Sequence, residues 1–191
     1  TLTVTADTQT KTYGDANPSL TFKYDGFKNE DKESVLDFPP IASTTVSLTT
    51  SVGTYSITVS GGSDNNYDFT YVSAGFEVTK ALLLVTANSK IKVYGDSNPP
   101  LTATYNGWKN NDTKAVLDVE PVASTSVDLY SNVGIYSDAI TVFGGSDNNY
   151  SFAYVPAEFR VIKAMLTITA DAKTKIYGDA NPPLTFQYSG W

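Results

Sequence analysis

The 191-residue chain has 41% hydrophobic and 17% charged residues, so side-chain burial can drive its folding. It contains no cysteine and no histidine, which excludes disulfides, thiolate or imidazole ligands for zinc, and a Ser-His-Asp triad. Its net charge of -7 disfavours nucleic acid as a partner, and no apolar stretch of about 18 residues could insert into a membrane.

The segment 1–27 predicts two strands joined by a turn. Positions 2–7 alternate between apolar and Thr or Asp side chains, and positions 20–25 alternate in the same way. A period of two is typical of a half-buried strand with a Thr-rich outer face. Between them, YGDANP (13–18) has the glycine, Asx and proline residues of a turn.

The next segment, NEDKESVLD (29–37), is the only helix-like stretch of its kind, together with its counterpart NNDTKAVLD (110–118). We expect Asp31 or Asp112 to cap one or two helical turns, because Asp is a preferred N-cap residue. Pro39 or Pro121 would then end the helix.

Residues 52–79 predict three further strands. Gly53 and Tyr55 enter an alternating strand in a Gly-x-Tyr pattern that is similar to the tyrosine corner of Ig-like sandwiches. We interpret GGSDNNY (61–67) as a turn that closes a hairpin. Aromatic residues at strand spacing follow it, and Phe76 and Val78 lie on the last strand.

The whole pattern repeats. YGDANPSLTFKYDGF begins at position 13, and its variants begin at positions 94 and 177. GGSDNNY at position 61 returns unchanged at position 144, a spacing longer by two than that of the first two YGD copies. The insertion falls between these landmarks, and Asp138 and Ala139 are the natural candidates. We therefore predict modules at 1–80 and 81–163 and a partial third repeat at 164–191, although modules starting near 28 and 109 fit the period equally well.

These patterns predict an all-β protein built from tandem small antiparallel β-sandwich modules of the Ig-like kind. The alternative is a β-grasp-like sheet carrying one short helix. The junction at 75–87 has no Gly, Pro or Ser run after Gly75, which favours a stiff connection and an elongated rod. Leu82 and Leu84 replace Thr1 and Thr3 of the first repeat, so we predict that a neighbouring module covers these two leucines.

Several side chains could carry a site. In one interpretation, the segments GGSDNNYDF (61–69) and GGSDNNYSF (144–152) bind calcium through oxygen-bearing side chains, and the candidate ligands are Asp64, Asn66, Asp68, Asp147 and Asn149. Local hydrogen bonding in a turn explains the same residues, and Ser151 replaces Asp68 in the second copy, so we expect no metal and no cofactor.

An alternative function is sugar binding by exposed aromatic side chains. The candidates are the residues that end the three YGD segments: Phe27, Trp108 and Trp191. We expect them to pack structurally instead. Lys80 and Lys163 end hydrophobic strands and are the lysines to test for isopeptide crosslinks. No catalytic residues are expected, because an active site has no reason to recur in every repeat.

The YGDxNPxLT, Y-x-G-[FW], VGxY and GG…NNY motifs together resemble the MBG domain of the YGX type. The resemblance implies tandem repeats of a large bacterial adhesin-like protein, located outside the cell at its surface. It implies a stalk or filament whose partners are neighbouring repeats of the same chain. The alternative is an adhesion module whose loops bind a host or environmental glycan. The family brings no catalytic residues.

Overall fold

The computed structural model describes residues 1–190 and contains almost only β-strands, which confirms the all-β prediction. The first repeat forms seven of the described strands: β1 Leu2–Ala6, β2 Gln9–Thr12, β3 Phe22–Asp25, β4 Ile41–Thr44, β5 Gly53–Ser60, β6 Phe69–Val72 and β7 Ala74–Thr79. Among the described residues, no helix is long and apolar enough to cross a membrane.

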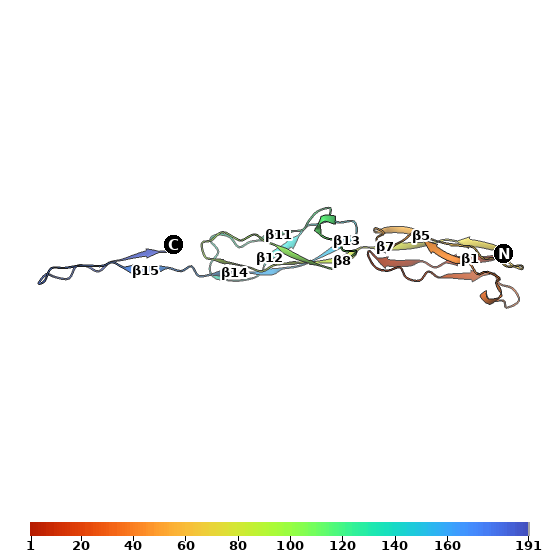
Figure 1. Ribbon diagram of the computed structural model, residues 1–191, viewed down its shortest axis with the longest axis horizontal. Coiled ribbons are helices and arrows are strands. Elements are labelled where there is room, and N and C mark those ends of the chain that lie inside the picture. The colour runs from red at the N-terminus through yellow and green to blue at the C-terminus, as the bar shows by residue number, and fades with distance from the viewer. Residues whose placement is uncertain (191) are drawn as a thin grey trace. The chain divides into compact units, whose positions relative to one another are not determined.

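These strands form two sheets, with orders β3-β1-β6 and β2-β7-β5-β4; Figure 1 labels β1 of the first sheet and β5 and β7 of the second. Most pairs are antiparallel, as predicted, but β1 pairs with β6 and β2 pairs with β7 in parallel. The GGSDNNY segment joins β5 of one sheet to β6 of the other, so the prediction that it closes a hairpin is wrong. Instead, it carries the chain across the sandwich.

The core lies between the two sheets because each strand turns its apolar positions inward. Leu2, Val4 and Ala6 of β1 are buried, while Thr5 between them is exposed. From the other sheet, β5 and β7 contribute buried side chains to the core: Ile57, Val59, Phe76 and Val78. Burial of such side chains stabilises a fold by about 25 cal/mol for each Å² of apolar surface.

The Gly-x-Tyr pattern makes the hydrogen bond of a tyrosine corner. The Tyr55 hydroxyl donates to the Ser51 carbonyl at 2.9 Å, and the Tyr136 hydroxyl donates to the Asn132 carbonyl at 2.8 Å. Each bond ties the start of a strand to the loop that precedes it.

The helix-like segments are single turns of 3-10 helix, Glu33–Val35 (η1) and Lys114–Val116 (η2). The expectation that Asp31 or Asp112 caps them is wrong. Lys32 is the N-cap residue of η1 and makes no side-chain cap bond, whereas the Thr113 side chain of η2 accepts from the Ala115 amide. Both aspartates instead accept hydrogen bonds from tyrosine hydroxyls.

The second repeat has the same strand sequence: β8 Ala81–Ala87, β9 Lys90–Val93, β10 Ala103–Asn106, β11 Val122–Thr125, β12 Gly134–Phe143, β13 Tyr150–Val155 and β14 Ala157–Ile162. Its sheets have orders β10-β8-β13 and β11-β12-β14-β9. The predicted insertion at Asp138 and Ala139 is confirmed, because the β12–β14 register shifts between Tyr136 and Ile140, and Asp138 has a positive φ of 52°.

The third segment contributes β15 Thr167–Ala170 and β16 Phe186–Ser189, which pair antiparallel. They correspond to β1 and β3 of the first repeat, but all of their residues are exposed. A two-stranded pair alone buries too little apolar surface to form a core.

The described chain divides into two compact units. Unit 1 consists of Thr1–Leu84, Tyr105–Pro121 and Gly144–Ala153. It thus holds the first repeat, the first part of β8, and two loop regions of the second repeat with the strand residues beside them. Unit 2 consists of Val85–Thr104, Val122–Phe143 and the described residues from Tyr154 onward.

Candidate interface between neighbouring repeats

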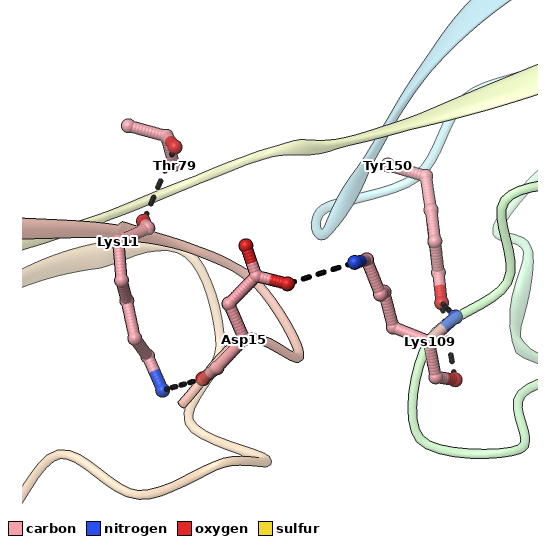
Figure 2. Close-up of polar contacts among 5 residues, drawn as sticks. All are labelled: Lys11, Asp15, Thr79, Lys109 and Tyr150. Atoms are coloured by element: carbon pink, nitrogen blue, oxygen red, sulfur yellow. Dashed lines mark hydrogen bonds and ion pairs between the residues drawn. The ribbon is translucent and has the colours of Figure 1, made fainter. Parts of the chain in front are cut away.

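Within unit 1, the loops of the second repeat contact the first repeat at its YGD turn. The Lys109 ammonium lies 2.7 Å from the Asp15 carboxylate, so the two oppositely charged groups form an ion pair (Figure 2). Both side chains are partly exposed, and such pairs typically contribute about 0–1 kcal/mol. This ion pair therefore adds specificity more than stability.

Two buried tyrosines lie at the centre of the contact. The Tyr13 hydroxyl donates to Asp112 Oδ2 at 3.1 Å, and the Tyr150 hydroxyl donates to the same oxygen at 2.8 Å. The Tyr13 and Tyr150 rings meet edge to face with centroids 5.6 Å apart. Burial raises the pKa of Tyr150 above that of free tyrosine, and the Asp112 charge raises it further. Asp112 thus joins a tyrosine of each repeat through one carboxylate oxygen.

The second loop, which contains the second GGSDNNY segment, completes the contact. The Val52 amide donates to Asn149 Oδ1 at 3.0 Å, and the Lys80 ammonium donates to the Asp147 carbonyl at 2.8 Å. These bonds satisfy polar groups at the point where the first repeat ends and β8 begins.

The backbone of the YGD turn lies unusually close to the Lys109 side chain of the second repeat. Gly14 has a φ of +78°, which non-glycine residues rarely adopt, and a Cβ placed on it would overlap the Lys109 side chain. The glycine of the motif is therefore required here both by the turn and by the contact.

Lys11 holds the turn in place, a role that the sequence did not predict. This lysine is only 6% exposed, and its ammonium donates to the Asp15 carbonyl at 3.0 Å and to the Ser47 carbonyl at 2.5 Å. Burial lowers the pKa of Lys11. Thr79 donates to the Lys11 carbonyl at 3.2 Å, as Figure 2 also shows. The available signal was a lysine at an inward strand position two residues before each YGD.

Asn17 of the motif pins the same turn to the neighbouring loop, since its amide donates to the Val46 carbonyl at 2.6 Å. Asp and Asn side chains in a turn commonly bond their own backbone. For Asn17 the bond found is to a residue 29 positions away.

The alternative calcium ligands are used in other contacts. The Asp64 carboxylate accepts a hydrogen bond from the Asn66 backbone amide at 2.7 Å, and the Asp147 carboxylate accepts one from the Asn149 backbone amide at 2.7 Å. Asp68 is exposed, and Asn149 Oδ1 faces Val52. Within residues 1–190, no group of three or more Asp and Glu side chains could hold a metal ion. The expectation that the protein needs no cofactor stays a prediction.

The candidate sugar-binding aromatics pack against tyrosines. Phe27 meets Tyr67 edge to face at 5.4 Å, and Trp108 meets Tyr150 in the same way at 5.2 Å. Both side chains are partly buried, so neither ring is fully available to stack on a sugar. Trp191 lies outside the described residues.

Leu82 and Leu84 lie on the outward face of β8, with exposed fractions of 61% and 36%. The alternation of β8 turns Ala81, Leu83 and Val85 into the core instead. The structure therefore does not bring these two leucines into the contact between the first two repeats, which polar side chains and tyrosines make. The lysines proposed for crosslinks, Lys80 and Lys163, are both exposed.

Comparison with known families agrees with this repeat structure. The family model described as MBG domain (YGX type) matches residues 2–77, 83–160 and 166–191. The chain belongs to this family. Its three matches are three tandem MBG repeats, the arrangement expected for a repeat region of a surface protein. A search of curated proteins found no match.

Proposed function

We propose that these MBG repeats form a stalk that extends a bacterial surface adhesin from the cell, and that they act mechanically. The observation that carries the proposal is the contact of the first repeat with loops of the second. An ion pair, a shared carboxylate and two loop hydrogen bonds tie them together within one compact unit.

The connection between these repeats is also too short to act as a flexible linker. β7 ends at Thr79 and β8 begins at Ala81, so Lys80 alone separates the two strands. A flexible linker would need several Gly, Ser or polar residues here. A stalk needs this property, because free rotation at each junction would shorten its reach.

The alternative, recognition of a glycan through the loops, has less support. Its aromatic candidates Phe27 and Trp108 pack on tyrosines, and the second GGSDNNY loop contacts the first repeat. A glycan array probed with the folded chain tests this alternative directly. Binding that is lost in a folded Trp108→Ala variant would favour recognition over the stalk.

The stalk proposal is tested by measuring the spread of distances between the repeats. Because the chain has no cysteine, Thr45→Cys in the first repeat and Asp118→Cys in the second provide two unique sites for spin labels on exposed positions of unit 1. We expect a narrow distance distribution by pulsed electron paramagnetic resonance. A Gly-Ser insertion after Lys80 is the matched control and should broaden it. A distribution as broad without the insertion would contradict the proposal.

A further inference from the structure

Each residue on the first repeat's side of the contact has a counterpart in the second repeat. The repeat spacing equates Tyr13, Asp15, Val52 and Lys80 with Tyr94, Asp96, Val133 and Lys163. All four counterparts belong to unit 2. We call these four residues the unit 2 surface.

The unit 2 surface has the same internal support as its counterpart. The Lys92 ammonium donates to the carbonyls of Asp96 and Asp128, as Lys11 does to those of Asp15 and Ser47. The Asn98 amide donates to the Val127 carbonyl at 2.5 Å. The YGD turn is therefore already in the conformation that binds a neighbouring loop in unit 1.

The two surfaces differ in whether loops of another repeat cover them. Tyr94 is 46% exposed, whereas Tyr13 is 7% exposed beneath the loops of the second repeat. A Cβ placed on Gly95 would meet nothing within 4 Å, whereas one on Gly14 would overlap Lys109. Val133 is also 46% exposed, and it lines a surface pocket with Lys163. In unit 1 the corresponding position, beside Val52 and Lys80, receives Asn149 and Asp147.

The complementary loop also forms without a neighbour. In the first repeat, the Lys28 amide donates to the Tyr67 hydroxyl at 2.9 Å, which donates to Asp31 at 2.7 Å. The second repeat has the same pair of bonds at Lys109, Tyr150 and Asp112. Lys28 and Asn66 are exposed, whereas their counterparts Lys109 and Asn149 are partly buried. Both sides of the contact are thus preformed, which lowers the entropic cost of docking.

We propose that the unit 2 surface is the docking surface for the loops of a further MBG repeat joined at Lys163 as the second repeat is joined at Lys80. Tyr94 would donate to the aspartate that corresponds to Asp112. Asp96 would pair with the lysine that corresponds to Lys109, and the Val133 amide would donate to the counterpart of Asn149. Docking at the unit 2 surface is compatible both with a stalk and with repeats that bind a ligand.

The test completes a third repeat in frame by adding a second copy of residues 109–163 after Trp191. Hydrogen exchange measured by nuclear magnetic resonance then reports on the Val133 amide. We expect its exchange to slow by about tenfold or more relative to the original chain. The Val52 amide, already bonded to Asn149, should be protected in both proteins and serves as the internal control. Alanine at the added counterparts of Lys109 and Asn149 should restore fast exchange at Val133.

A second extended chain controls for misfolding of the added repeat. It carries another copy of residues 81–163 in place of 164–191. Unprotected Val133 in both extended chains, with Val52 still protected, would overturn the inference. Analytical ultracentrifugation of the original chain tests the other occupant. Self-association that Tyr94→Ala abolishes would assign the surface to a second copy instead. The distance measurement between the first two repeats does not involve this surface, so either hypothesis can fail alone.

Discussion

At the scale of single residues, a tyrosine hydroxyl directed at a carboxylate recurs throughout this protein. Tyr67 donates to Asp31, Tyr150 donates to Asp112, and Tyr24 donates to Glu33 at 3.3 Å. Each bond requires the neutral, protonated hydroxyl, because a phenolate would face a second negative charge in a partly desolvated site. The native fold therefore depends on tyrosines that stay protonated.

This dependence predicts a loss of stability at high pH. Burial and the charge of Glu33 raise the pKa of Tyr24 to about 12, above the value near 10 of unfolded tyrosine. Its stabilising contribution is thus fully present below pH 10 and is lost as the pH rises to about 12. One group changes the free energy of unfolding by at most about 1.4 kcal/mol per pH unit.

Urea unfolding between pH 9 and 12 measures this effect. We expect Tyr24→Phe to flatten the decline in the free energy of unfolding, and Glu33→Gln to flatten it in part. An unchanged slope in Tyr24→Phe would show that other groups cause the decline.

Individual residue roles were harder to predict than the turn that contains them. The YGDxNP motif predicted a turn, but which side chains it contacts depends on pairs far apart in sequence, such as Asp15 with Lys109 and Asn17 with Val46. Buried Lys11 was missed because lysine on an inward strand position contradicts the usual pattern of burial. The Asp15 carbonyl of the adjacent turn and the Ser47 carbonyl of a distant loop offset the cost of burying its ammonium.

At the scale of elements, alternation in the sequence predicted the strands but not all of their partners. The apolar positions of β1, β5 and β7 determined which faces are buried. The parallel β1–β6 and β2–β7 pairs were not predicted, because period-two patterning is the same for either strand direction. Turn residues at GGSDNNY likewise could not distinguish a hairpin from a crossover between sheets.

The β12 bulge gives a prediction at this scale. Tyr136 and Ile140 flank three residues, whereas Tyr55 and Ile57 in β5 flank Ser56 alone and keep a continuous register with β7. Deleting Asp138 and Ala139 should therefore recreate the β5 arrangement. It also removes the positive φ of Asp138, a conformation that costs most side chains about 1 kcal/mol.

We expect the deletion variant to remain folded, with a melting temperature equal to or up to a few degrees above that of the parent. Differential scanning calorimetry measures it. Deleting the equivalent number of residues from the unbulged strand β5, Thr58 and Val59, is the control and should unfold the first repeat, since Val59 is in the core. Unfolding of both variants would mean that the bulge is required.

At the scale of the whole molecule, the chain provides its own comparison between an occupied and an open contact surface. In tandem-repeat proteins, stability is approximately the sum of the repeats and of the interfaces between neighbours. The contact at Tyr13, Asp15 and Val52 is such an interface term. A substitution in the second repeat should consequently change the stability of the first.

Asn149→Ala makes this coupling measurable. It removes the acceptor of the Val52 amide and should lower the stability of the first repeat by about 1–2 kcal/mol, the cost of leaving a partly buried donor without an acceptor. Exchange of the Ile57 amide, in the core strand of the first repeat, reports that loss. Asn66→Ala is the matched control in the first repeat itself: this side chain is exposed, and only its backbone amide bonds to Asp64, so we expect a change below about 0.5 kcal/mol. Equal effects of the two substitutions would mean that the contact contributes no coupling, and the repeats would then be stable independently of their neighbours.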